Sequence, residues 1–490
     1  MNPKNITVLY LDFQTVGDEI KEIIKNEHLG ELIFKKQKLF AYHKGIYESL
    51  GFNHFIHLNN NQQLKDLVHR MKSSDGGMFV VHHSSVAVID QEKFGLFIEK
   101  MVLLNQSICL SDFSETKPLF FDSSIGLKSF FEAITDFGKP FEEVFSEYSS
   151  DIECLRKETF YTHIKDLGSL IQFLHSNFEA RHFNQIEKDE LTITKKSNKI
   201  DKIKAEFEYY HHVPNELKSF FLPTFDFRTS DNQASYKLEK LNVPDMAMLW
   251  VHGAVKPHEF KTFLKRVFLF LKRRPLRNVN TDFFQNESIS NELYLNKLKT
   301  RVEEFSKMPE FSKINHLLKN HSELGGIEEC VENYEKKLKD LIQEKKYKPR
   351  NAFSHGDLCF SNMLYDKRTQ LLKLIDPRGA KDPDDLYMDM YYDLAKLSHS
   401  VLGNYDFINS GLFEFKTNTQ LAFDLEIQTA ENLDSLKEIF IEELKNEGFD
   451  LKLVRIFEAS LFLSMLPLHI DNPKKVLAFA LNAQLILKTL

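Results

Sequence analysis

The chain of 490 residues contains few cysteines, a single tryptophan and no long apolar run. The four cysteines lie far apart and form no C-x-x-C pair, which argues against a disulfide framework or a zinc site. No stretch approaches the roughly 20 apolar residues that cross a bilayer, so any membrane association would be peripheral. The first apolar run is short and is broken by Asp12. The sequence therefore predicts no signal peptide, and a reducing cytoplasm is the expected compartment.

The chain also lacks an excess of basic residues. It has 64 Lys and Arg against 71 Asp and Glu, a formal net charge of −7, which disfavours a nucleic-acid partner. With 42% apolar and 28% charged residues the composition is that of a soluble globular protein. We interpret the 44 phenylalanines as core packing. The length predicts two or three structural units, and nothing in the sequence predicts an oligomeric state.

Residues 1–150 alternate between two patterns. Strand-like runs occupy 6–13, 54–58, 77–81, 84–89 and 117–121, and helical runs occupy 16–26, 40–50, 62–71 and 92–103. This alternation predicts an α/β domain of three layers with a mostly parallel sheet.

The segment KQKLFAYHKGIYESLGFNHFIHL resembles the helix-then-strand segment of sugar-phosphate nucleotidyltransferases. The glycine-rich, Arg-containing nucleotide loop of that family should follow the first strand, but YLDFQTVGDEI stands there instead. The resemblance therefore implies either an inactive relic or an active domain. A second interpretation takes Asp12-Phe13-Gln14 as a damaged haloacid-dehalogenase motif, in which Gln14 replaces the second aspartate.

Three further segments follow. Residues 151–180 are expected to form a helical linker, and 181–253 read as strands, one helix and more strands. Residues 254–490 are overwhelmingly helical, apart from short strands near 363–365 and 371–375. The prediction is an α+β fold with a small sheet-rich lobe before a large helical lobe.

The most informative segment is SHGDLCFSN, residues 354–362, which is followed by a short hairpin and LIDPRG, residues 374–379. The pattern H-G-D-x-x-x-x-N with a later apolar strand ending in I-D resembles the aminoglycoside phosphotransferase and choline kinase superfamily. The resemblance implies a bilobal kinase-like fold that uses ATP and Mg²⁺. Protein kinases share this logic through H-R-D-x-x-x-x-N and D-F-G.

Phosphoryl transfer needs positioning and neutralisation of charge more than covalent help. Asp357 would orient the acceptor hydroxyl and take its proton late. Asn362 and Asp376 would hold magnesium through hard oxygen ligands. His355 would hydrogen-bond to backbone near Asp376 and fix the loop. Asp393, on a helix within YDLAK, would brace that loop from behind.

A kinase site also needs a strand lysine and a helical acid that holds it. If Leu191 and Ile193 are buried against the helix of the small lobe, alternation directs Lys196 rather than Lys195 toward the cleft. The preferred acid is Glu206, in an E-x-x-Y-Y spacing that resembles the E-x-x-F-Y of the family, and the alternative acid is Glu208.

The segment ASYKLEKLNV looks like the strand that leads to the adenine hinge, with backbone of Glu239, Lys240 and Leu241 near the base. Residues 169–252 contain no glycine, so no glycine-rich loop can cover the phosphates. The turn around Arg181, Asn184 and Gln185 is the candidate substitute. The absence of a glycine-rich loop also favours a small-molecule substrate over a protein substrate.

Two helices carry basic residues whose role the sequence leaves open. The first is either a core helix with a solvated basic face or a contact for an anionic substrate or membrane; its residues are Lys265, Arg266, Lys272, Arg273 and Arg274. The second would line the acceptor pocket or lie on the surface; its residues are Tyr294, Lys297 and Arg301.

These patterns predict an ATP- and Mg-dependent phosphotransferase acting on a hydroxyl of a small metabolite. The resemblance to bacterial capsule and surface-polysaccharide proteins implies a sugar, amino alcohol or choline-like acceptor. The alternatives are an inactive nucleotide-binding scaffold and a transferase that transfers AMP or modifies a protein.

Overall fold

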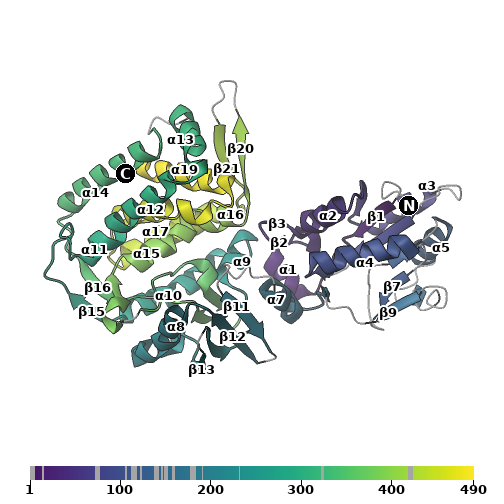
Figure 1. Cartoon of the computed structure of the whole chain (residues 1–490), viewed down its shortest axis with the longest axis horizontal. Helices are drawn as coiled ribbons and strands as arrows, with labels where there is room; N and C mark the ends of the chain where they lie inside the picture. The colour runs from purple at the N-terminus through teal and green to yellow at the C-terminus, as the bar shows by residue number, and fades with distance from the viewer. Residues whose placement is uncertain are drawn as a thin grey trace. The chain divides into compact units, whose positions relative to one another are not determined.

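The computed structural model describes most of the chain. The described residues are 6–13, 16–71, 78–104, 108–111, 119–121, 124–136, 143–144, 147, 153–156, 160–176, 184–189, 191–230, 232–321, 325–380, 382–417 and 423–490. The chain divides into two compact units, Met1–Phe178 and Glu179–Leu490, and each is considered by itself (Figure 1).

The first unit is built on a mixed six-stranded sheet in the order β4-β1-β5-β8-β7-β9. Its strands are β1 (Ile6–Leu11), β4 (His54–Leu58), β5 (Met78–His83), β7 (Ile108–Ser111), β8 (Leu119–Phe121) and β9 (Glu153–Arg156). The expected parallel arrangement is found where β1 pairs with β4 and β5, and again between β7 and β9. It fails at β8, which runs antiparallel to both of its neighbours.

Helices pack against both faces of the central strand β1. The helices of this unit are α1 (Asp18–Ile24), α2 (Leu39–Ser49), α3 (Asn61–Arg70), α4 (Gln91–Leu104), α5 (Ser124–Thr135) and α7 (Leu167–Ser176). Leu9 and Leu11 belong to an apolar cluster with residues of α3 and α5. Tyr10, on the opposite face, donates or accepts a hydrogen bond with His43 of α2 at 3.0 Å. Burial on both faces explains why this strand is largely apolar, with Thr7 at its less buried second position.

The helical linker predicted for 151–180 is wrong for the described part of that segment. β9 pairs with β7, and β10 (Tyr161–His163) pairs with β6 (Val86–Val88), so both strands belong to the first unit. Only the last part is helical, as α7, and the unit extends to Phe178. The prediction failed because pairing with distant strands, which local sequence does not reveal, decides the conformation here. The short strands β2 (Ile33–Phe34) and β3 (Gln37–Lys38) complete the unit.

Asp12 lies directly after β1 and is buried. Its Oδ1 accepts from the backbone N–H of Gly30 at 2.9 Å, and its Oδ2 lies 3.1 Å from Nε2 of His57. Gly30 has no room for a side chain, because a Cβ there would lie 2.3 Å from Asp12 Oδ2. The carboxylate is therefore enclosed. Gln14, the other residue of the dehalogenase-like interpretation, lies outside the described residues.

The second unit begins with a four-stranded antiparallel sheet in the order β11-β12-β14-β13. The elements of this part are β11 (Asn184–Lys188), β12 (Thr192–Ser197), α8 (Ile200–His212), β13 (Thr224–Thr229) and β14 (Ala234–Glu239). Ile203 of α8 packs in one apolar cluster with Ala234 and Tyr236 of β14, so α8 covers this face of the sheet.

The rest of the second unit is largely helical. Its helices are α9 (Met246–Val251), α10 (Pro257–Arg273), α11 (Ile289–Asn291), α12 (Lys297–Ser306), α13 (Pro309–His321), α14 (Ile327–Glu344), α15 (Tyr392–Val401), α16 (Tyr405–Asn409), α17 (Leu433–Asn446), α18 (Leu451–Ser464) and α19 (Pro473–Thr489). α18 is buried around most of its circumference, as expected for a central helix. Figure 1 shows α12, α14 and α19 in one part of this unit and α8 with β11–β13 in another. In the part of the chain that is described, no helix is both long and apolar enough for a membrane span.

Short strands within the helical part position the loops that carry the motifs. They are β15 (Leu276–Asn278), β16 (Arg350–Phe353), β17 (Met363–Asp366), β18 (Leu371–Leu374), β19 (Tyr387–Asp389), β20 (Phe413–Thr417) and β21 (Phe423–Ile427). The predicted hairpin is present as β17 and β18. The sequence did not predict β15, β16 and β19, which form one small sheet. That sheet fixes the start of the loop at 354.

Candidate active site

His355 anchors the H-G-D loop, which leaves β16 at residue 354. Its Nε2 lies 3.0 Å from the carbonyl oxygen of Ile375, and its Nδ1 lies 3.2 Å from the backbone nitrogen of Asp357. A carbonyl oxygen can only accept, so Nε2 carries the proton and Nδ1 accepts from the N–H of Asp357. Burial lowers the pKa of the ring and favours this neutral form. The hydrogen bond expected beside Asp376 is therefore present.

A buried ion pair holds the same loop from behind. Asp393, on α15, accepts from the backbone N–H of His355 at 3.0 Å and of Gly356 at 2.9 Å. Its Oδ2 also lies 2.8 Å from Nη1 of Arg274. Both charged side chains are buried, so each supplies the other's counter-charge. The bracing contact predicted for Asp393 is present, whereas Arg274 is not part of a solvated basic face.

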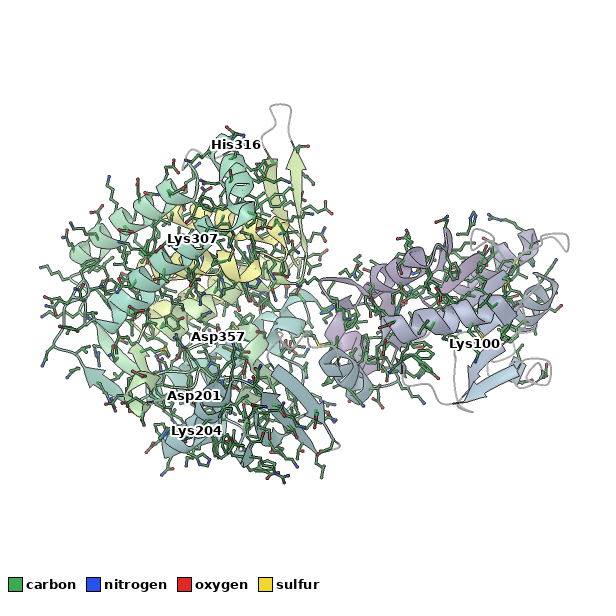
Figure 2. All side chains as sticks on the ribbon, in the orientation of Figure 1. Lys100, Asp201, Lys204, Lys307, His316 and Asp357 are labelled. Atoms are coloured by element: carbon green, nitrogen blue, oxygen red, sulfur yellow. The ribbon has the colours of Figure 1, made fainter. Side chains whose placement is uncertain are left out.

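Asp357 extends from this loop with its side chain 43% exposed. Its Oδ1 lies 2.9 Å from Nζ of Lys396 on α15, and its Oδ2 lies 3.2 Å from Nδ2 of Asn362. Burial tends to raise the pKa of Asp357, but the charge and hydrogen bond of Lys396 outweigh it and lower the pKa to about 2. The carboxylate is thus ionised at neutral pH and only weakly basic. Figure 2 labels Asp357 within the second unit.

Asn362 turns back toward Asp357, as its spacing of five residues predicts. Its Nδ2 donates to the backbone oxygen of Asp357 at 2.9 Å as well as to the carboxylate. The turn is fixed by Phe360, whose buried ring packs edge-on against Trp250 at 5.0 Å and Phe263 at 5.7 Å. The amide nitrogen is thereby committed to Asp357, which directs the amide oxygen elsewhere.

Asp376 follows β18 in a left-handed conformation, with φ 54°. Aspartate tolerates this region better than most residues do. Its side chain is 56% exposed, and its Oδ1 lies 2.5 Å from Nζ of Lys195 on β12. The same ammonium lies 2.6 Å from Oε2 of Glu206 on α8. Lys195 therefore connects the sheet, α8 and the loop that carries Asp376.

The prediction that Lys196 pairs with Glu206 is wrong. Lys196 is directed to the other face of β12, where its Nζ lies 2.5 Å from Glu187. Side chains do alternate between the two faces of β12. The prediction assumed that the site lysine extends from the face opposite α8, but it extends from the face that α8 covers. Leu191, assumed to be buried, lies before β12 and is exposed. Glu208 pairs with Lys204 along α8 and does not contact Lys195.

Close backbone contact joins the Asp376 loop to α8. A Cβ at Gly379 would lie 2.4 Å from the backbone carbon of Ala205 and 2.6 Å from the nitrogen of Glu206. Gly356 has φ +80°, and a Cβ there would lie 2.7 Å from Cβ of Arg378. Glycine is therefore required at both positions, because the loops approach too closely for any side chain.

The predicted hinge follows β14. Glu239 is the last residue of this strand and is exposed, and Leu241 is half-buried. The backbone N–H of Lys240 donates to the oxygen of Leu191 at 2.9 Å, so it is already used within the sheet. Contacts of Glu239 and Leu241 with a base stay a prediction.

The proposed phosphate turn falls partly outside the described residues, since Arg181 is not among them. Asn184 and Gln185 lie on β11.

Asn362 and Asp376 fit a magnesium site of the kind that is completed by a substrate. Mg²⁺ is usually bound through one or two carboxylates, waters and substrate phosphates rather than by an all-protein cage. An exposed carboxylate and a nearby amide oxygen supply suitable oxygen donors. The described residues contain no group of three or more His, Cys, Asp or Glu arranged to hold a metal.

Sequence analysis missed the roles of Lys396 and Arg274. Lys396 lies three residues after Asp393 on one helix, so both side chains lie on one face, and that spacing was a usable signal. Arg274 comes just after α10, and its pairing with a residue 119 positions away had no local signal.

The chain matches no protein-family model, and no curated protein matches it in sequence. Among solved structures, the apo form of a thermostable mutant of aminoglycoside phosphotransferase APH(4)-Ia is 11% identical, with 65% of this chain and 98% of that chain covered and a TM-score of 0.35. Glucosamine kinase is 10% identical, with coverages of 66% and 84% and a TM-score of 0.37. Aminoglycoside-3'-phosphotransferase of type VIII is 11% identical, with coverages of 57% and 93% and a TM-score of 0.31. Likeness at this level carries no argument about activity.

Proposed function

We propose that the second unit is a bilobal, kinase-like phosphotransferase that uses ATP and Mg²⁺ to phosphorylate a hydroxyl of a small metabolite. One observation carries this proposal. The fold brings Asp357 together with Asn362, and Asp376 together with Lys195 of β12 and Glu206 of α8; the His355–Ile375 hydrogen bond joins the loops that carry the two aspartates. These groups come from segments up to 181 residues apart.

The acceptor hydroxyl would donate a hydrogen bond to Asp357. With a pKa of about 2, this carboxylate is too weak a base to remove the proton early. Its main contribution is therefore orientation, and it would accept the proton late, as the new oxygen–phosphorus bond forms.

Lys195 would contact the phosphates of the nucleotide while Glu206 keeps its ammonium in place. Mg²⁺, held by Asn362 and Asp376, would supply charge neutralisation on the phosphates. His355 would keep the two loops in register. Glu239 and Leu241 would flank the base.

A sugar, amino alcohol or choline-like acceptor in surface-polysaccharide biosynthesis is the proposed context, supported by the sequence resemblance. The first unit would then be a nucleotidyltransferase-like relic or an active partner domain. The proposed compartment is the cytoplasm.

The test measures ADP release from Mg-ATP by the full chain with a panel of sugars, amino alcohols and aminoglycosides. Asp357→Asn should retain Mg-ATP binding and lose acceptor-stimulated release, whereas Asp376→Asn should lose Mg-dependent nucleotide binding measured by calorimetry. Asp434→Asn, an exposed carboxylate on α17, is the control. Full turnover in Asp357→Asn would contradict the assignment, and a product heavier by AMP would indicate the alternative transferase.

A further inference from the structure

Three cationic side chains lie on the segments around Asp357: Lys396 contacts it, Arg378 lies against the preceding Gly356, and Lys297 contacts Tyr392, one helical turn before Lys396. Oδ2 of Asp357 contacts Asn362, whereas Oδ1 contacts Lys396 at 2.9 Å. Lys297, on α12, donates from Nζ to the hydroxyl of Tyr392 at 3.0 Å. Arg378 lies against Gly356, the residue before Asp357, and its backbone N–H donates to the oxygen of His355 at 2.8 Å. The cations thus come from three separate segments.

Only one of these three charges is balanced by a carboxylate. Lys396 pairs with Asp357, but Lys297 contacts a phenol, over whose ring its ammonium also lies at 5.4 Å from the centroid. No described carboxylate lies within 4.0 Å of the charged nitrogens of Lys297 or Arg378. Half-buried Lys297 and exposed Arg378 therefore leave two positive charges near Tyr392 and Gly356, on segments that adjoin Lys396 and Asp357.

Tyr392 lies close to these charges, since it contacts Lys297 and precedes Lys396 by one helical turn on α15. Its side chain is buried, and burial by itself would raise the pKa of the hydroxyl. The charges of Lys297, Lys396 and Arg378 outweigh burial, and the pKa is lowered. Nearby positive charges and a hydrogen bond from Lys297 both favour the ionised phenol and so lower its pKa. A cationic acceptor would be repelled from such a place.

We propose that the acceptor carries an acidic group, a carboxylate or a phosphate, that Lys297 and Arg378 bind while its hydroxyl lies on Asp357. This inference rests on the proposed function and replaces the cationic amino-alcohol and choline-like acceptors named there with hydroxy acids or phosphorylated alcohols. The hydroxyl oxygen forms a bond to the γ-phosphorus, and the bond from that phosphorus to the β,γ-bridging oxygen breaks. The electron pair leaves with ADP, and the proton passes to Asp357 and then to water.

The first test compares matched compounds in the ADP-release assay with the full chain: glycerol, glycerate and glycerol 3-phosphate, and glucose, glucuronate and glucose 6-phosphate, beside choline. We expect at least one acidic member to exceed its neutral counterpart in kcat/KM by about tenfold or more, the value of one charge-assisted hydrogen bond. Whether the carboxylates or the phosphates respond identifies the anion. Greater stimulation by neutral compounds or choline, or none by any acid, overturns the inference.

The second test uses Lys297→Met and Arg378→Met. Each should raise the KM for the acidic acceptor about tenfold or more and leave the KM for Mg-ATP within about twofold. Lys299→Met is the matched control, because Lys299 lies on the same helix but is exposed and pairs with Glu335. A raised KM for Mg-ATP with an unchanged KM for the acceptor would mean that these cations bind the nucleotide, which overturns the inference.

The same assays distinguish failure of the proposed kinase function from failure of the acidic-acceptor hypothesis alone. If the proposed kinase function is wrong, no compound of any charge gives ADP release that depends on Asp357. If only the acidic acceptor is wrong, neutral or cationic compounds give release that is lost in Asp357→Asn and unaffected by Lys297→Met.

Discussion

Each unit has an aspartate just beyond a buried strand, but one carboxylate is enclosed and the other is accessible. Asp12 follows β1 and is 1% exposed, with both carboxylate oxygens occupied by Gly30 and His57. Asp357 follows β16 by four residues and is 43% exposed, with one oxygen near Lys396 and one near Asn362.

The difference lies in what surrounds each carboxylate. Around Asp12 the backbone comes so close that a Cβ at Gly30 would overlap Asp12 Oδ2. Around Asp357 the support comes from behind, through Asp393 and Arg274, which leaves the front of the loop accessible. A carboxylate that is to meet a substrate needs a rigid loop and an open face; Asp357 has both, whereas Asp12 is enclosed.

The largest expected effect separates the two aspartates directly. Asp357→Asn should lower phosphotransfer by about a thousandfold, within the range typical of general acid–base residues. Asp12→Asn should leave it within about twofold of the original rate, since Asp12 lies in the other unit and is enclosed. Both rates come from acceptor-dependent ADP release. Equal losses of phosphotransfer rate in the two variants would show that the accessible aspartate has no special role.

The support behind Asp357 is tested by Arg274→Met. Removal of one partner from a buried ion pair leaves Asp393 uncompensated and should cost about 3–5 kcal/mol of unfolding free energy. The neighbouring, exposed Arg273→Met should change it by less than about 0.5 kcal/mol. Urea unfolding followed in the second unit measures both. Equal stability of the two variants would show that the pair does not hold the loop.

The proposed nucleotide-binding role of Lys195 is tested by a pair of adjacent lysines. Lys195→Ala should lower kcat/KM for Mg-ATP by about a hundredfold, because an ammonium fixed by Glu206 is lost. Lys196→Ala should stay within about twofold, since Lys196 pairs with Glu187 on the other face. Steady-state kinetics with varied ATP measures both. A larger loss in Lys196→Ala than in Lys195→Ala would support the original prediction of Lys196 as the site lysine.

The smallest effect concerns Asp406, a buried carboxylate in the second unit. Burial, helped by Asp245, raises its pKa to about 7, the opposite direction from Asp357. The folded state then binds more protons than the unfolded state, so stability falls as pH rises from about 4 to 7. Asp406→Asn should reduce this slope by up to about 1.4 kcal/mol per pH unit. Urea unfolding at pH 5, 6 and 7 measures the slope, and parallel curves for variant and original chain would contradict it.

Much of the site followed from sequence because its spacing is local. The H-G-D-x-x-x-x-N turn and the β17–β18 hairpin place His355, Asn362 and Asp376 within one continuous segment, so their contacts were predictable. The face of β12 that carries the site lysine was not predictable, because alternation separates the two faces of a strand without showing which of them α8 covers. The linker prediction failed for a similar reason, since β9 and β10 pair with strands far away in the chain.

The sequence by itself predicted which residue types would carry the proposed chemistry: the two aspartates and the asparagine at fixed spacing, and a strand lysine with a helical glutamate. The tertiary structure decided which lysine meets Glu206, that Arg274 is the buried counter-charge of Asp393, and that Lys396 pairs with Asp357 while Lys297 contacts Tyr392. The physical reason is distance along the chain. Local spacing fixes neighbours within a helix turn or hairpin, whereas charge pairing between segments 119 or 181 residues apart depends on how the whole unit packs.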